Sequence, residues 1–286
     1  MAALSRTVST WDGFGLHLRV WGEGRAGLPL LCLPGLVRSG ADFADFAERH
    51  AGQRRVVAID YLGRGGSDRA AKPDRYAPEL MLRDVLDACA AVHLHRVILV
   101  GTSFGGLLGM GIAVMRPGLL AGVVLNDIGP VLGAAGEAFI RRFVADDPEL
   151  PDLDTAAAHL RTLLPHLSFS TDAEWRRFAT LTYVEGADGR WHPNWDTRIA
   201  ELLVGPVRDL WPLFNALAHV PTLLLHGARS SLLLDATVAE MRAVRPDMQV
   251  ATIAEAGHAP SLAEPVALAA VDGFIARIGR GGCLPD

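Results

Sequence analysis

The stretch RVILVGTSFGGLLGMGIAVM, residues 96–115, decides the fold. After Arg96, residues 97–100 form a short apolar run, which is typical of a strand buried on both faces of a parallel sheet. The second half of the stretch repeats apolar residues at spacings of three and four, as an amphipathic helix does, and Pro117 ends that helix. The glycine-rich turn at residues 101–106 therefore joins a buried strand to a helix.

The same alternation of strand and helix continues on both sides of this unit, after a short hairpin near residues 16–21. Strands are expected at residues 28–33, 54–60, 96–100, 123–126, 221–225 and 249–253. Helices are expected from Pro78, at 107–115, at 236–244 and from Ser261, and the tail 279–286 is expected to be frayed. This order predicts an α/β fold, a mostly parallel doubly wound sheet with helices on both faces.

Residues 136–214 break the alternation. They show helical stretches, no strand pattern and four of the six tryptophans. We therefore expect one core domain formed by residues 1–135 and 215–286, with residues 136–214 inserted as a helical cap over the substrate pocket. Trp175 and Trp191 are candidate substrate contacts, although most aromatic residues of a small helical layer form its own core.

Composition excludes several classes of function. The chain has 286 residues, 27 cationic against 32 acidic side chains and a formal charge of −5, so nucleic acid is not an expected partner. Its three cysteines are far apart and suggest neither disulfides nor a zinc site. Neither a signal peptide nor a membrane span can be recognised, so we expect a cytoplasmic monomer or homodimer with no membrane partner.

Ser103 is the candidate nucleophile. It lies in Gly101-Thr102-Ser103-Phe104-Gly105, where a serine on a sharp turn between strand and helix exposes its hydroxyl above the sheet. The alternative is a simple helix cap. A serine needs a base, and His258 is expected on the loop between the last strand and the last helix, at the carboxyl edge where catalytic groups of such sheets gather.

Four motifs in order resemble the α/β-hydrolase fold family whose members carry a cap, which includes esterases, lactonases and carbon–carbon bond hydrolases. They are Pro34-Gly35-Leu36, the loop DYLGRGGS at residues 60–67, the turn around Ser103 and Gly257-His258. The resemblance implies an oxyanion hole formed by the backbone N–H groups of Leu36 and Phe104. Phe104, beside the nucleophile, is the best candidate for a side chain that also contacts substrate, and no metal or organic cofactor is implied. The loop at 60–68 is expected to be structural, with Arg64 pairing locally.

The chain departs from the family pattern at the third catalytic residue. Ser231 stands where related chains carry the acid that orients the histidine. Asp127, at the end of the strand that follows the Ser103 helix, is at the second position from which this fold supplies its acid. Two alternatives stay open, since Asp127 could simply cap the turn into the insert, and Asp235 could act instead.

The expected function is hydrolysis of a small or medium-sized apolar carboxylic ester, lactone or thioester through an acyl-enzyme on Ser103. Two other hypotheses are a carbon–carbon bond hydrolase that uses the same serine and histidine, and a ligand-binding protein whose hydrolase site is impaired by Ser231.

Overall fold

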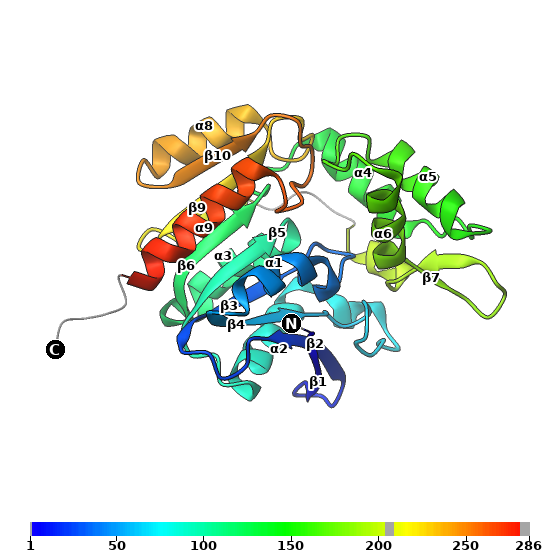
Figure 1. The fold of residues 1–286 in the computed structure, drawn as a ribbon, viewed down its shortest axis with the longest axis horizontal. Coiled ribbons are helices and arrows are strands. Elements are labelled where there is room, and N and C mark those ends of the chain that lie inside the picture. The colour runs from blue at the N-terminus through cyan, green and yellow to red at the C-terminus, as the bar shows by residue number, and fades with distance from the viewer. Residues whose placement is uncertain (1, 204–208, 281–286) are drawn as a thin grey trace.

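The computed structural model describes residues 2–203 and 209–280. Within them, the main sheet has eight strands in the order β1-β2-β4-β3-β5-β6-β9-β10 (Figure 1). The strands are β1 (Leu4–Ser9), β2 (Gly15–Trp21), β3 (Gly27–Leu33), β4 (Arg54–Ile59), β5 (Val97–Thr102), β6 (Leu120–Asn126), β9 (Thr222–Gly227) and β10 (Gln249–Ile253). Strands β1 and β2 form an antiparallel hairpin, β2 runs antiparallel to β4, and all other pairs are parallel. The predicted fold class is therefore confirmed.

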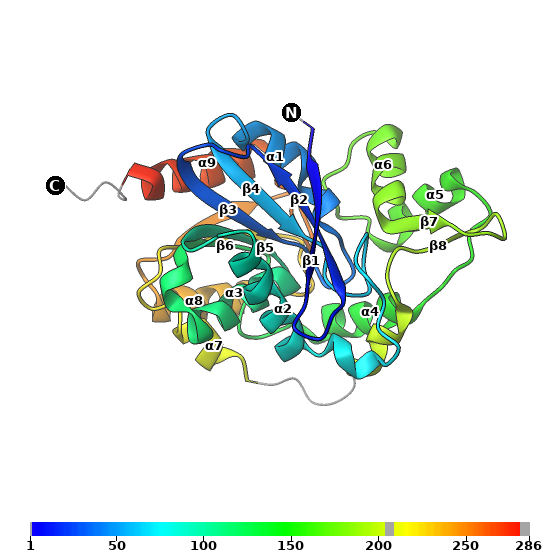
Figure 2. The same cartoon turned by 90° about the horizontal axis from the view of Figure 1, so that it is seen from below.

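Helices cover both faces of this sheet (Figure 2). Because successive strand residues point to opposite faces, Ile98 and Val100 of β5 pack with α1 and α9, whereas Val97 and Leu99 pack with α2, α3 and α8. These helices are α1 (Ala44–His50), α2 (Pro78–Ala91), α3 (Phe104–Met115), α8 (Asp235–Val244) and α9 (Pro265–Arg280). Short 3-10 helices occupy η1 (Gly40–Phe43), η2 (Pro73–Tyr76) and η3 (Pro117–Leu119).

In the segment between β6 and β9, helices α4, α5 and α6 lie to one side of the sheet (Figure 1), whereas α7 lies against α3 (Figure 2). The segment contains α4 (Ala134–Ala145), α5 (Leu153–Leu163), α6 (Asp172–Thr182), β7 (Tyr183–Glu185), β8 (Trp191–Pro193), η4 (Thr197–Leu203) and α7 (Trp211–Asn215). The expectation that this segment lacks strands is wrong, because β7 and β8 pair as an antiparallel hairpin. Each strand is only three residues long, too short for a visible alternation, but Asp188-Gly189 at its tip is a hairpin turn signal.

Element boundaries differ from expectation by a few residues. The last helix begins at Pro265 rather than Ser261, because the backbone N–H of Ser261 donates to the Glu264 carboxylate ahead of the helix. Strand β6 begins at Leu120, three residues earlier than expected. The predicted frayed tail falls mostly on residues 281–286, which lie outside the described part of the chain together with Cys283.

The two described cysteines, Cys32 and Cys89, are buried free thiols whose pKa values are raised by burial. Across residues 2–203 and 209–280, no helix is both long and apolar enough to span a bilayer. The same residues hold no cluster of three or more His, Cys, Asp or Glu side chains placed to bind a metal ion.

Candidate active site

Ser103 occupies the sharp turn between β5 and α3. Its φ of 51° and ψ of −116° place a non-glycine residue in a sparsely populated backbone region, a strain that costs about 1–3 kcal/mol. The flanking glycines make this turn possible, since a Cβ at Gly105 would lie 2.0 Å from the Leu33 carbonyl oxygen and one at Gly101 would lie 2.6 Å from Gly105. Ser103 makes no side-chain hydrogen bond to the helix, so it does not cap α3.

His258 lies on the loop between β10 and α9 and faces Ser103. Its Nε2 is 2.8 Å from Ser103 Oγ and its Nδ1 is 2.8 Å from Asp127 Oδ2. A carboxylate can only accept, so these partners assign the proton of the neutral ring to Nδ1 and leave Nε2 free to accept the serine proton. The side chain is one-fifth exposed, and the structure thus joins the predicted serine and histidine directly.

Asp127 follows the last residue of β6 and is fully buried. One carboxylate oxygen accepts from His258, and the other accepts from the backbone N–H of Gly227 at 2.9 Å. Its own backbone N–H donates to the Leu225 carbonyl at 2.8 Å. The carboxylate therefore bonds to β9 and the histidine loop rather than to the turn into the insert, which was the structural alternative.

The other two candidates for the acid position lie apart from His258. Ser231 is exposed, and within the described residues it makes no hydrogen bond to the histidine. Asp235 is 90% exposed, and its carboxylate lies 3.7 Å from the buried His226 ring. Gly227, which the sequence analysis does not single out, is the contribution of β9 to the site. Its only local signal is a glycine at the end of a buried strand.

The two predicted oxyanion donors lie on loops beside the nucleophile. Leu36 follows β3 in a turn that Arg38 N–H closes onto the Gly35 carbonyl at 3.1 Å. A Cβ at Gly35 would lie 3.9 Å from Ser103 Cβ, so this turn packs against the nucleophile. Within the described residues, the backbone N–H groups of Leu36 and Phe104 have no hydrogen-bond acceptor, so both are available to a ligand.

Arg64 is hydrogen-bonded to the backbone of the Leu36 turn. Its Nε donates to the Leu36 carbonyl at 2.7 Å and its Nη1 donates to the Leu62 carbonyl at 2.6 Å. Burial lowers the pKa of this guanidinium to about 10, so the group remains charged at neutral pH. The expectation of local pairing is met by two backbone carbonyls instead of a carboxylate, and one of them belongs to a predicted oxyanion residue.

The insert contacts two loops at the carboxyl edge. The backbone N–H of Gly257, the residue before His258, donates to the His166 carbonyl at 2.6 Å. Arg38 donates to Thr182, and its guanidinium carbon lies 4.3 Å from the centre of the Phe178 ring. These contacts place α6 and the loop before it beside the loops that carry Arg38 and Gly257.

The predicted substrate contacts have different surroundings. Phe104 is 8% exposed, and its ring packs edge to face with the Tyr61 ring, with 5.7 Å between the ring centres. Trp175 packs edge to face with Phe169 inside the insert, with 5.2 Å between the ring centres. Trp191 is half-buried in β8, and its backbone pairs with Leu150. Substrate contact by these three side chains remains a prediction.

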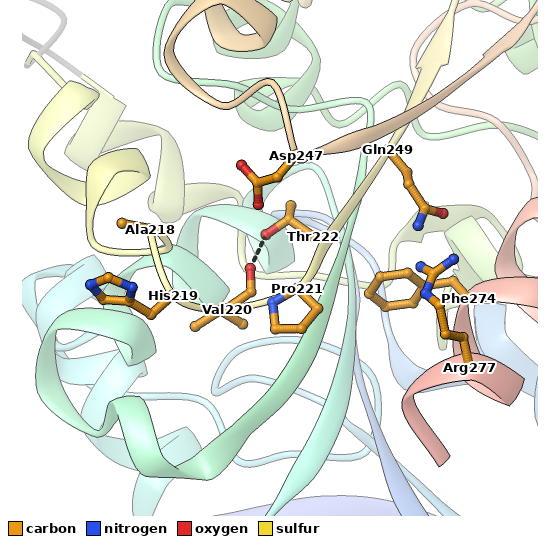
Figure 3. A pocket seen from close by; sticks show the side chains of 9 residues that line it. All are labelled: Ala218, His219, Val220, Pro221, Thr222, Asp247, Gln249, Phe274 and Arg277. Carbon is orange, nitrogen blue, oxygen red and sulfur yellow. Dashed lines mark hydrogen bonds between the residues drawn. The ribbon is translucent and has the colours of Figure 1, made fainter. Parts of the chain in front are cut away.

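A separate cavity of about 290 Å³ lies at the opposite edge of the sheet (Figure 3). It is lined by residues 218–222, Asp247, Gln249, Phe274 and Arg277, at the amino ends of β9 and β10. Its acidic group, Asp247, is paired with Arg245 at 2.7 Å. Ser103 and His258 belong to the carboxyl edge, so this cavity is not their substrate pocket.

Comparison with known proteins agrees with this fold. The family model described as alpha/beta hydrolase fold matches residues 29–265. A 3-hydroxybutyrate-oligomer hydrolase of Cupriavidus necator is 31% identical, with 91% of this chain and 93% of the relative covered. An sn-1-specific diacylglycerol lipase of Mus musculus is 29% identical over 82% of this chain and 77% of its own.

Among solved structures, an alpha/beta hydrolase from Novosphingobium aromaticivorans superposes with a TM-score of 0.91 and 37% identity, covering 97% of this chain and 99% of the other. The chain belongs to the alpha/beta hydrolase fold family. The two relatives named above are hydrolytic enzymes.

Proposed function

We propose that this protein is a serine hydrolase of carboxylic esters that works through an acyl-enzyme on Ser103. The observation that carries the proposal is the continuous hydrogen-bond chain from Ser103 Oγ through His258 to Asp127, with both links at 2.8 Å. Such a chain supplies an activated nucleophile, a proton shuttle and a buried anion opposite the ring that becomes positively charged.

The reaction follows from these positions. His258 Nε2 takes the Ser103 proton as Oγ attacks the ester carbonyl, and the backbone N–H groups of Leu36 and Phe104 stabilise the oxyanion that forms. The imidazolium then protonates the leaving alcohol. A water molecule, activated by the same histidine, releases the acid and restores the serine. Asp127 keeps the ring oriented and offsets its charge throughout.

We propose small or medium-sized esters as the substrate class. The relative from Cupriavidus necator is a hydrolase of 3-hydroxybutyrate oligomers, which are short oligoesters, and this chain spans 93% of that protein. Dimers and trimers of 3-hydroxybutyrate are therefore the natural substrates to test beside a simple aryl ester.

The test compares wild-type protein with Ser103→Ala on p-nitrophenyl butyrate and on 3-hydroxybutyrate trimer. We expect hydrolysis of the aryl ester to fall on the order of 10⁵-fold in the variant. A fluorophosphonate probe should label the wild-type protein at Ser103 and leave the variant unlabelled. Hydrolysis and labelling that survive in a folded Ser103→Ala variant would refute the proposal.

The alternative of an impaired binding protein rested on Ser231. With Asp127 hydrogen-bonded to His258, the missing acid at position 231 no longer argues for impairment. Carbon–carbon bond hydrolysis uses the same serine and histidine, and a comparison of turnover between the aryl ester and a β-diketone separates the two reactions.

A further inference from the structure

Asn126 is a fully buried polar residue at the end of β6, between the strand core and Asp127. Its backbone carbonyl accepts from the backbone N–H of Ser103 at 2.9 Å. Its side-chain Nδ2 donates to the Pro260 carbonyl at 2.9 Å and to Thr102 Oγ1 at 3.1 Å. Asn126 is thus linked to all three members of the Ser103–His258–Asp127 chain. It is hydrogen-bonded to the Ser103 backbone, it is hydrogen-bonded to the loop of His258 at Pro260, and it precedes Asp127 in the sequence.

The orientation of this amide follows from its partners. The Pro260 carbonyl can only accept a hydrogen bond, so the NH₂ group must face it, and Oδ1 must point the other way. In that position Oδ1 is buried and has no donor within the described residues. A buried acceptor without a partner is costly, and an apolar side chain of similar volume would avoid that cost. Stability alone therefore does not account for an amide here.

The bond to Pro260 acts on a stretch of chain with few other restraints. Gly257 is held by the His166 carbonyl, and Ser261 is held by the Glu264 carboxylate. Among described residues, the Asn126 amide makes the one hydrogen bond to the backbone of residues 258–260. The His258 ring must stay within 2.8 Å of both Ser103 and Asp127. The Asn126 side chain ties the backbone of the His258 loop to the ends of β5 and β6, through Pro260 and Thr102.

We propose that Asn126 is a positioning residue that holds the His258 loop in register with Ser103. The inference rests on the proposed serine mechanism. It assigns Asn126 no contact with substrate, and its effect is transmitted through the Pro260 carbonyl to the histidine backbone. Loss of the Nδ2 donor should therefore slow the steps in which His258 moves a proton while leaving substrate binding intact.

The test uses Asn126→Asp and Asn126→Leu in the full chain, with Thr102→Val as the matched control. Both Asn126 variants keep the number and branching of side-chain heavy atoms and remove the donor, and only the first adds charge, so a shared effect reports the donor. Thr102→Val removes the other acceptor and leaves the Pro260 bond. Melting temperature, kcat and KM for p-nitrophenyl butyrate, the rate of fluorophosphonate labelling and the low-field proton NMR signal of the His258 ring N–H are measured.

We expect both Asn126 variants to lose about 10- to 100-fold in kcat with KM within about 3-fold. Labelling should slow in parallel and the ring N–H signal should broaden, whereas Thr102→Val should stay within about 3-fold of wild type. If both variants fail to fold, Asn126→Ser, which is smaller and polar, must show the same loss in kcat.

The inference is overturned if folded Asn126 variants keep wild-type kcat and labelling rates, if their loss only follows the folded fraction, or if Thr102→Val loses as much. An active Ser103→Ala protein would instead overturn the proposed function, and the inference with it. An inactive Ser103→Ala protein beside fully active Asn126 variants would overturn this inference alone.

Discussion

The ends of β6 and β9 lie side by side in the sheet, and the first contributes a side-chain carboxylate to the site whereas the second contributes a backbone N–H group. β6 is followed directly by Asp127, whose buried carboxylate is hydrogen-bonded to His258. β9 ends in Gly227, whose backbone N–H donates to that same carboxylate, and Ser231 on its loop is exposed. Because the two strands are parallel neighbours, a carboxylate at either end could approach a histidine loop that follows β10. The geometry thus requires an acid at the carboxyl edge of the sheet, and either β6 or β9 can supply it.

Gly227→Ala should have the largest effect among changes on the β9 side. A Cβ at position 227 would lie 2.5 Å from the Gly257 carbonyl oxygen and 2.7 Å from that of Ala256, and backbone atoms cannot yield as side chains do. We expect a loss of about 2–3 kcal/mol in the free energy of unfolding and at least a tenfold loss of kcat, since the histidine loop is displaced. Urea unfolding and ester hydrolysis measure both.

Gly118→Ala is the control for that prediction, because a Cβ at position 118 meets no atom within 4 Å. It should leave stability and activity close to wild type. A Gly227→Ala protein that behaves like the control would mean that the β9 end does not support the site.

Ser231→Asp should have a much smaller effect. Position 231 is exposed, and Asp127 already occupies the hydrogen-bonding position on His258 Nδ1. A carboxylate at 231 would therefore remain solvated, and kcat for p-nitrophenyl butyrate should change less than about threefold. An increase of tenfold or more would show that the site lacks a working acid and that the two strand ends have been assigned wrongly.

A histidine outside the site gives the smallest predicted effect. Hydrogen bonds to Asp147 and then to Asp188 raise the pKa of His192, a surface residue of the insert. A raised pKa contributes stability that is fully present below the unfolded value of about 6.5 and is lost as pH rises through the folded value. The melting temperature of wild type should exceed that of His192→Gln slightly near pH 6, with the difference vanishing toward pH 9.

Solvent screening keeps this contribution small. Equal melting temperatures of the two proteins at every pH would show that the His192 ion pairs contribute nothing. A difference that grows with pH would contradict the direction assigned to the pKa.

Local patterns predict most of the fold, because buried strands and amphipathic helices leave their periodicity in the sequence. The apolar run of β5 and the helix after it also frame Ser103, and the loop before α9 frames His258. The hairpin of β7 and β8 cannot be predicted in this way, because strands of three residues carry no detectable alternation.

The choice between Asp127, Ser231 and Asp235 could not be made from local sequence. It depends on which strand end faces the histidine loop, and the order of β6, β9 and β10 is a property of the sheet. Asn126 left one faint signal, an amide that ends an otherwise apolar buried strand, LAGVVLN. Its partners, Pro260 and Thr102, come from loops and strands far away in the chain.

Asp127→Asn tests the central claim most directly. The amide keeps the volume and can still accept from Gly227, but its NH₂ group faces His258 Nδ1, so the ring is pushed toward the wrong tautomer. We predict a fall in kcat of about 10³- to 10⁴-fold for p-nitrophenyl butyrate, with the melting temperature nearly unchanged. A folded Asp127→Asn protein that retains kcat within tenfold of wild type would contradict the assignment of Asp127 as the acid.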